Sequence, residues 1–364
     1  LTKPELQLGI EKVITQKISK NDLYTSSTSG SSGQPLNFAK DKNSHSRTWA
    51  FWIKRYREMG LSMASKEARF YGIPKNFKGY IIEKIKDFIL NRVRFTVFDL
   101  SEKNLSKYLK KFTKIKFDYI YGYTNSILIF SKYLQKKGIV LKDVCKSLKI
   151  VVLTSEVCTN EDRLVIEKYI GVPVKNEYGA SEVGYIAYEC NSKSWHVCKE
   201  NIFIEHDSSG RLLVTDLFNK AFPIIRYEIG DLGKVENKVC KCGKEDLIIT
   251  NFDGRKNDTV FLPNGDISPG FTFYYISREI LESEYPIKEF IVRQTLINKL
   301  IFEVVMDIEI SDNIVKYLQN LVDEYVGKGL KIKVEKVNSI DRTESGKIKH
   351  FYSEINEQFE MEKA

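Results

Sequence analysis

The sequence predicts a layered α/β protein with a small α+β domain at its C-terminal end. Strand-like and helix-like stretches alternate as far as about residue 184, and this alternation is typical of a sheet with parallel pairing. Past residue 200 the chain changes to short strands and turns, and from Leu300 a strand, a helix and another strand follow. We therefore expect one large domain built on a sheet, followed by a smaller unit.

The spacing of apolar residues predicts the elements in order. Recurrence at every third or fourth position predicts helices over 5–18, 44–59, 81–90, 101 onward, 126–135, a stretch up to 169, and 313–326. Runs of β-branched and aromatic residues predict strands over 36–38, 68–73, 95–98, 148–154, 172–175, 300–308 and 331–337, with another strand ending at 119–124. Residues 176–184 are expected to form a loop, Gly138 to end a helix, and a last helix to close the chain.

Composition narrows the class of protein. Hydrophobic residues make up 42% of the chain and charged residues 29%, which is ordinary for a globular protein with a sizeable core. No apolar run approaches the roughly 20 residues of a membrane span. The net charge of +9 is spread out without a basic stripe, which disfavours nucleic acid as a partner. The six cysteines are too unevenly spaced for a disulfide framework, and the start resembles no targeting peptide, so we expect a cytoplasmic protein.

The stretch Thr25–Pro35 begins with nine residues that are all Ser, Thr or Gly. Such a run can turn sharply and present backbone N–H and hydroxyl donors to an anion, as a polyphosphate-binding loop must. A flexible linker is the alternative. The return of apolar sequence at Leu36 favours the loop. No Lys follows Gly33 as it would in a P-loop, so magnesium or a distant Lys must supply positive charge.

Polar residues gather where predicted strands end, at 121–124, 154–156, 178–182 and 226–231. Ligands of open α/β sheets bind at the carboxyl ends of strands. Each cluster alone is weak evidence, because an acid after a strand more often marks the start of a helix. The clusters together with the Ser/Gly loop predict one ligand site along this edge of the sheet.

Five motifs stand in the order seen in adenylate-forming enzymes: the loop Thr28–Pro35, then Glu177–Glu182, Pro223–Asp231, Gly254–Asp258 and Asp341–Lys347. The chain resembles this superfamily of acyl-CoA synthetases, nonribosomal adenylation domains and luciferases. It is most similar to the phenylacetate–CoA ligase branch, especially its relatives of capsule polysaccharide biosynthesis. The resemblance implies a large N-terminal domain over 1–256, with a strand-rich subdomain over about 185–256, and a small mobile lid domain over 257–364.

The resemblance also implies a reaction. A ligase of this kind joins a carboxylic acid to ATP, forms acyl-AMP and pyrophosphate, and passes the acyl group to coenzyme A. Lys347 would bridge the carboxylate and the α-phosphate, and Glu182 would hold magnesium, a hard cation that prefers oxygen. Ser181 stands where the family usually has Thr and would reach the α-phosphate. Asn257 would be the hinge between the domains, where Asp or Lys is commoner.

The nucleotide site implied by the resemblance draws on several segments. Tyr178 would stack on adenine, Asp231 would accept hydrogen bonds from the ribose, and Arg255 would contact ribose or phosphate. The other expected contacts come from the loop and from the residue after the tyrosine: Thr28, Ser29, Gly30, Ser31, Ser32, Gly33 and Gly179.

The acyl pocket is expected at a strand end, where the family builds its substrate wall. Tyr121, Tyr123 and Thr124 lie at that strand end, and Ala180 is a small residue beside the adenylate position. An aromatic lining suits an aryl or short apolar acid. The alternative is that these residues are ordinary core at a strand–helix turn.

Cysteine and histidine form a second constellation. One His and three Cys suit tetrahedral zinc, and relatives of the phenylacetate–CoA ligase type resemble this chain in pairing Glu-Cys…His with a later Cys-x-Cys-Gly. The predicted ligands of a structural zinc are Cys190, His196, Cys240 and Cys242, with Cys198 in reserve. Cys145 and Cys158 are expected in the core.

Two other functions stay open at this stage. The enzyme could deliver the activated acid to a sugar amine or a carrier in surface polysaccharide biosynthesis. The protein could also bind nucleotide without catalysis, although the presence of Glu182, Asp231, Arg255 and Lys347 together weakens this reading. The identity of the acid, the acceptor and the oligomeric state, including a homodimer, are not readable from the sequence.

Overall fold

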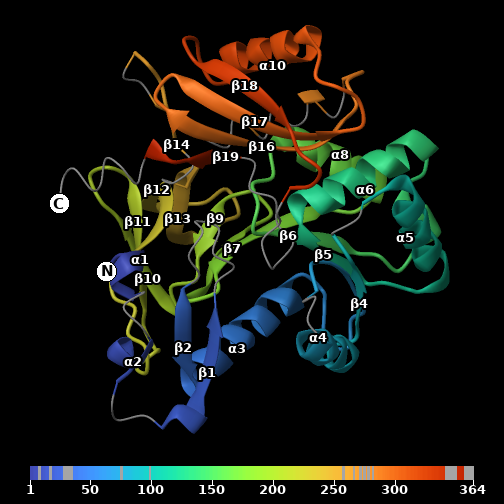
Figure 1. Ribbon diagram of the computed structural model, residues 1–364. Helices are drawn as coiled ribbons and strands as arrows, with labels where there is room; N and C mark the ends of the chain where they lie inside the picture. The colour runs from blue at the N-terminus through green and yellow to red at the C-terminus, as the bar shows by residue number, and fades with distance from the viewer. Residues whose placement is uncertain are drawn as a thin grey trace.

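A computed structural model describes residues 1–6, 10–15, 19–27, 36–73, 77–97, 100–255, 259–264, 267–269, 273, 276, 279–280, 283–340 and 351–355. In this part of the chain one mixed sheet has 11 strands, in the order β10-β11-β12-β13-β9-β8-β7-β6-β5-β3-β4 (Figure 1). No helix among these residues is long and apolar enough to cross a membrane.

One half of the sheet is parallel, as the alternation of strands and helices predicts. Its strands, which pair in register along β4-β3-β5-β6-β7, are β3 (Glu67–Phe70), β4 (Arg92–Phe95), β5 (Tyr119–Tyr123), β6 (Ile150–Thr154) and β7 (Val174–Ala180). The helices between and beside them are α3 (Lys42–Glu58), α4 (Phe77–Ile89), α5 (Glu102–Lys114), α6 (Thr124–Lys137), α7 (Leu141–Val144) and α8 (Asn160–Ile170). Gly138 ends α6 in the left-handed conformation, as expected.

Helices cover both faces of the parallel half. Because successive strand residues point to opposite faces, Ile120 packs with α5, α6 and α8 in one core, whereas Tyr119 packs with Tyr56 of α3 in another. Strand β5, which carries Tyr121 and Tyr123, therefore lies between two buried layers.

The other half of the sheet is antiparallel and continues the first without a break. Its strands are β8 (Gly184–Glu189), β9 (Trp195–Val197), β10 (Ile202–His206), β11 (Arg211–Asp216), β12 (Tyr227–Val239) and β13 (Glu245–Arg255). The strand-rich subdomain expected over about 185–256 is thus an extension of the main sheet. It shares its core with the N-terminal segment through Leu36 and Phe38.

The expectation of a loop over 176–184 is wrong. Strand β7 continues to Ala180, and only residues 181–183 form a turn before β8. Backbone pairing between β7 and β8 explains the difference. The two backbones are so close that a Cβ at Gly179 would lie 2.5 Å from the carbonyl oxygen of Gly184. Glycine at 179 lets the two strands approach closely enough to pair.

The helix predicted over 5–18 is only partly described, because residues 7–9 and 16–18 lie outside the described ranges. Its described residues are helical in α1 (Lys3–Leu6) and α2 (Ile10–Val13) but not at 14 and 15, and a 3-10 turn η1 (Lys20–Asp22) comes after them. A hairpin follows, with β1 (Leu23–Ser27) paired antiparallel to β2 (Asn37–Asp41). The strand predicted at 36–38 corresponds to the start of β2, whereas β1 was not predicted and includes Thr25–Ser27 of the expected loop.

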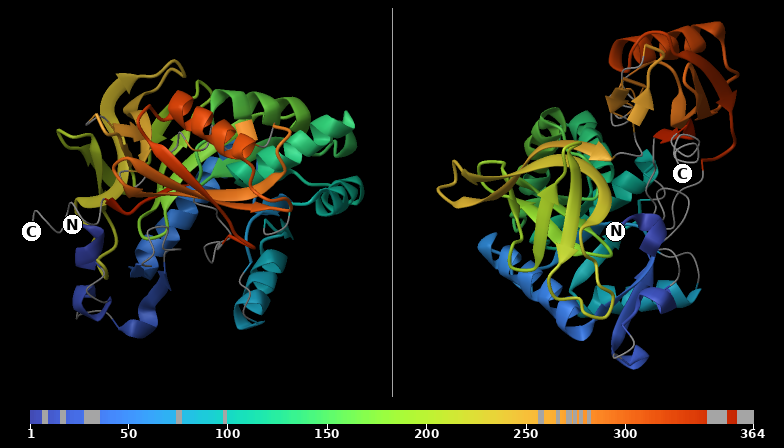
Figure 2. Two further views of the ribbon diagram at one scale, coloured as in Figure 1. Left: turned by 45° about the horizontal axis from the view of Figure 1, so that its top comes forward. Right: turned by 90° about the vertical axis from the view of Figure 1, so that its left-hand side faces the viewer.

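The C-terminal part has its own sheet and core and stands apart from the large sheet in Figure 2. Its sheet, in the order β18-β17-β16-β19, consists of β16 (Ile287–Leu296), β17 (Lys299–Met306), β18 (Lys331–Lys336) and β19 (Phe351–Ser353), with α10 (Asp312–Tyr325) packed against it. A short hairpin joins β14 (Thr259–Phe261) to β15 (Ile267–Pro269). The sequence predicted β17, α10 and β18 and missed β16, and the expected last helix falls mostly on residues outside the described ranges.

Candidate functional site

Tyr178 lies near the C-terminal end of strand β7. The Tyr178 hydroxyl donates a hydrogen bond of 2.6 Å to Oδ2 of Asp231 on β12. Its ring meets the Phe252 ring edge-on, with the centroids 4.6 Å apart. Asp231 is 7% exposed and pairs across the ladder with Arg255 on β13. The structure therefore brings together three positions predicted for the nucleotide, although the Arg255 side chain is outside what it describes.

The turn after β7 holds the predicted metal ligand. Glu182 is 7% exposed, and its Oε1 accepts a hydrogen bond of 3.2 Å from the hydroxyl of Tyr227, itself buried on β12. Ser181 beside it is exposed, and Ala180 at the end of β7 is half-buried. A carboxylate fixed at the end of a strand beside a tyrosine–aspartate pair can present an oxygen to a hard cation.

Several predicted site residues lie outside the described residues. These are Thr28, Ser29, Gly30, Ser31, Ser32, Gly33, Asn257 and Lys347. The strands that flank the loop, β1 and β2, are described, so the loop must connect Ser27 to the segment that begins at Leu36. The roles of these residues stay predictions.

The residues expected to line the acyl pocket on β5 differ in burial. Tyr121 is half-buried, whereas Tyr123 and Thr124 are 1% and 0% exposed. The Thr124 hydroxyl donates to the carbonyl of Glu156, and the Glu156 carboxylate accepts from the N–H of Asn125 at 2.8 Å. Glu156 therefore binds the start of α6, which is the helix-terminal role expected of an acid after a strand.

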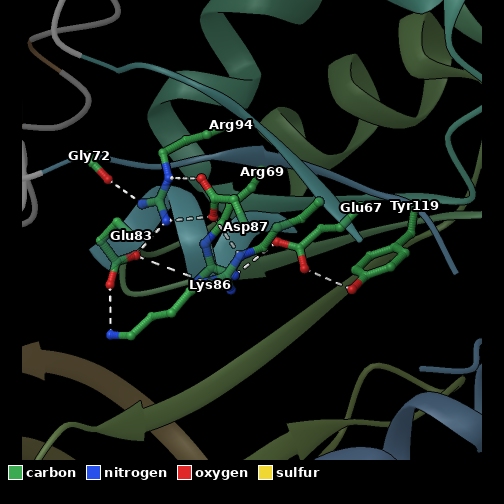
Figure 3. A network of polar contacts seen from close by, with 9 residues as sticks. Glu67, Arg69, Gly72, Glu83, Lys86, Asp87, Arg94 and Tyr119 are labelled. Atoms are coloured by element: carbon green, nitrogen blue, oxygen red, sulfur yellow. Dashed lines mark hydrogen bonds and ion pairs between the residues drawn. The ribbon is translucent and has the colours of Figure 1, made fainter. Parts of the chain in front are cut away.

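A guanidinium that sequence reasoning missed lies beside Tyr121. Arg69 of β3 lies over the rings of both Tyr71 and Tyr121, 4.7 Å from each centroid. It donates a hydrogen bond of 2.8 Å to Glu67, and Glu67 accepts another from Tyr119 (Figure 3). Arg69 is a charged residue within the aromatic and apolar strand predicted over 68–73, and this feature of the sequence could have marked it as a candidate.

The same polar network continues to helix α4. Arg94 of β4 contacts both Asp87 and Glu83, and Asp87 also accepts a hydrogen bond from Arg92 at 2.7 Å (Figure 3). These ion pairs hold α4 against the edge of the sheet. Strand β4 in turn pairs with β3, the strand that carries Arg69.

Two hairpins bring the four predicted zinc ligands together. Cys190 follows β8 and His196 lies in β9, whereas Cys240 and Cys242 lie in the turn between β12 and β13. Because His196 pairs with Ile248 across the β9–β13 ladder, the two hairpin turns lie side by side. One potential ligand atom from each of the four residues lies within 4.8 Å of the others. Cys198 is buried and outside this group.

The geometry of this group suits a metal. His196 is fully buried, and its Nδ1 lies 3.1 Å from Oδ2 of Asp246, which leaves Nε2 facing Cys242 Sγ at 3.5 Å. A carboxylate behind a ligating imidazole fixes its tautomer and orientation. Burial raises the pKa of Cys240, but hydrogen bonds, the largest from Ser194 and from the Cys242 N–H, outweigh it and hold the pKa at about 6. Three thiols and one imidazole at these distances fit tetrahedral zinc.

No family model matches the chain. Protein CapK from Staphylococcus aureus is 25% identical over 365 residues, which covers 95% of this chain and 77% of CapK. The phenylacetate-coenzyme A ligase of Thermus thermophilus is 25% identical over 150 residues, which covers 37% of this chain and 33% of that ligase. The structure of 2-hydroxyisobutyryl-CoA ligase in the postadenylation state, in complex with R3-HIB-AMP, superposes with a TM-score of 0.65 at 14% identity, covering 99% of this chain and 82% of that one.

The protein has the fold of the adenylate-forming ligases. Its sequence relatives support the phenylacetate–CoA ligase-like branch of that superfamily. The expected fold class, a large α/β part with a small α+β C-terminal part, is thereby confirmed. In this adenylate-forming fold Tyr178 and Glu182 each bond to a residue of β12, and the four predicted metal ligands lie together at two hairpins.

Proposed function

We propose that the protein activates a carboxylic acid with ATP, forms acyl-AMP and pyrophosphate, and transfers the acyl group to coenzyme A. The observation that carries the proposal is that two motif residues bond to the same strand, β12: Tyr178 to Asp231, and the buried Glu182 to Tyr227. Tyr178 lies near the C-terminal end of β7 and Glu182 in the turn after it. Asp231 belongs to another motif and lies on β12, which is not a neighbour of β7 in the sheet.

The proposed roles follow from the chemistry of each group. The Tyr178 ring, already fixed by Asp231 and Phe252, offers one face to adenine. Asp231 offers its carboxylate to the ribose hydroxyls, and Glu182 holds magnesium beside the phosphates. Lys347 enters with the small domain and offsets the repulsion between carboxylate and α-phosphate.

The two separate cores support a division at the proposed hinge. The large part has cores that end with Ile249 and Phe252, and the small part has a core that begins at Val260. We place the boundary between 256 and 257, with Asn257 absorbing the rotation of the small domain between adenylation and thioester formation.

The metal group has a structural role in this proposal. Cys190, His196, Cys240 and Cys242 would hold zinc, which crosslinks the β8–β9 and β12–β13 hairpins. Zinc supplies folding free energy at such a site and takes no part in acid activation.

A pyrophosphate exchange assay tests the proposal. Labelled pyrophosphate should enter ATP only when the purified protein is given magnesium and a suitable acid from a panel of aryl, short aliphatic, hydroxy and dicarboxylic acids. Thioester formation after addition of coenzyme A then identifies the acceptor. Exchange without thioester would favour a sugar amine or a carrier as acceptor. Nucleotide binding without exchange for any acid would favour the non-catalytic function.

A further inference from the structure

Lys40 is a buried ammonium in an unusual setting. It lies on β2, the strand that follows the Ser/Gly loop, and is 3% exposed. None of the ion pairs among the described residues includes Lys40. Its Nζ lies 5.9 Å from the centroid of the Phe38 ring. A buried charge without a counter-ion in contact is costly, so a function should be sought for it.

Lys40 lies close to the start of β8, just after the turn that carries Glu182. A Cβ at Gly184 would lie 3.3 Å from Lys40 Nζ and 3.1 Å from Oγ1 of Thr48 on α3. Gly184 is two residues after Glu182 and has a φ of +105°, so its backbone makes room for the ammonium. Lys40 therefore lies under the turn that carries the proposed magnesium ligand.

The charges of two carboxylates, Asp216 and Glu182, act on Lys40, although no ion pair among the described residues joins either of them to it. Hydrogen bonds hold both carboxylates in place. Oδ2 of Asp216 accepts from the Ser44 hydroxyl at 3.1 Å, and Oδ1 accepts from two backbone N–H groups. Oε1 of Glu182 accepts from Tyr227. Burial lowers the pKa of Lys40 to about 8, against the opposing charges of Asp216 and Glu182.

We infer that Lys40 is the fixed positive charge of the nucleotide site and binds the β- and γ-phosphates of MgATP. The inference rests on the proposed function. The sequence has no Lys directly after the loop, where a P-loop would place one, and so needs a cation from elsewhere. Lys40 is buried on the strand that leaves this loop and next to the turn that carries Glu182, and a phosphate oxygen would supply the partner that its ammonium lacks.

Direct binding measurements test the inference without knowledge of the acid. The affinities of wild-type protein and Lys40→Met for MgATP and for AMP are measured by calorimetry. Loss of one charge-assisted hydrogen bond should weaken MgATP binding about 10- to 100-fold. AMP, which lacks the β- and γ-phosphates, should bind within about twofold of wild type. Lys40→Arg, which keeps the charge, should recover part of the MgATP affinity. Lys40→Gln, which also removes the charge, is measured in place of Lys40→Met if that variant does not fold.

Lys42 provides the matched control on the same segment. Its side chain is 75% exposed and pairs with Asp22 at the surface. Lys42→Met should leave both affinities unchanged. Equal losses for MgATP and AMP in Lys40→Met, or no loss for MgATP, would overturn the inference and leave the proposed function standing. A wild-type protein that binds no MgATP would instead overturn the proposed function itself.

Discussion

The hydroxyl of Tyr178 and the carboxylate of Asp231 are joined by a hydrogen bond of 2.6 Å across 53 residues of sequence. The bond connects the last parallel strand, β7, to the antiparallel strand β12, which are not neighbours in the sheet. It therefore fixes the tyrosine ring relative to the acid, and both groups are pre-arranged before any nucleotide arrives.

This pair makes a prediction about adenine. Tyr178→Ala removes a stacking surface and should weaken ATP binding about 10-fold, since aromatic–base stacking contributes about 1–3 kcal/mol. Tyr178→Phe keeps the ring and loses only the hydroxyl, so its ATP affinity should lie closer to wild type. Calorimetric titration with ATP measures both. Equal affinity in Tyr178→Ala and wild type would exclude stacking on this ring.

Glu182 makes a prediction about magnesium. Glu182→Gln keeps the acceptor for Tyr227 but removes the negative charge that a hard cation prefers. The variant should melt near the wild-type temperature and should need a higher magnesium concentration for half-maximal pyrophosphate exchange. A magnesium titration of the exchange rate measures this. If the two titrations coincide, Glu182 has no part in metal binding.

Lys347 makes the sharpest kinetic prediction. Loss of one preorganised charge at a transition state costs on the order of 100- to 1000-fold, so Lys347→Ala should slow the adenylation half-reaction by about that factor. Pre-made acyl-AMP and coenzyme A should still react at nearly the wild-type rate, because in the proposed cycle the small domain moves this residue away from the site before thioester formation. Lys349→Ala is the control and should leave adenylation nearly intact. Equal loss in both half-reactions would contradict the domain rotation.

The cysteine–histidine group makes a prediction about metal content. The purified protein should contain about one zinc per chain, and Cys242→Ser should lose both the metal and much of its thermal stability, because zinc binding contributes to folding. Asp246→Asn should lower zinc affinity about 10- to 100-fold through the orientation of His196. Elemental analysis and chelator competition measure these effects. Cys158→Ser is the control, since Cys158 lies outside the group. Metal-free protein of unchanged stability, purified without chelator, would contradict the zinc site.

Glu177 makes a prediction about pH. Burial between β7 and α3 raises the pKa of this carboxyl from 4.5 to about 7. A raised pKa in the folded state means that the stability contributed by the neutral form is complete below pH 4.5, falls as the pH rises to about 7, and is lost above it. Glu177→Gln cannot ionise and should lose less stability than wild type between pH 5 and pH 8. Urea unfolding at several pH values measures the difference. Glu200→Gln, at an exposed ion pair with Lys54, is the control, and parallel pH profiles for wild type and Glu177→Gln would show that Glu177 is not buried as a neutral acid.

Local pattern in the sequence determined most of the fold. The β-branched run at 148–154 predicted β6, the apolar spacing at 44–59 predicted α3, and Gly138 predicted the end of α6. Each of these depends on side-chain period or on a single turn residue, which are properties of a short stretch of chain. The Cys and His residues and the Tyr-Gly-x-Ser-Glu motif could be chosen as candidates for the same reason.

Tertiary structure alone decided how these stretches meet. Most of the loop expected over 176–184 is strand, because its backbone pairs with β8. A local sequence pattern does not show which strand will be the partner. The burial of Lys40 follows from the packing of β2 under the turn before Gly184, more than 140 residues away in the chain. His196 meets Cys242 only because β9 pairs with β13 in one particular register. Register and packing are set by the sum of many non-local contacts, so the positions of these side chains relative to one another are properties of the whole fold.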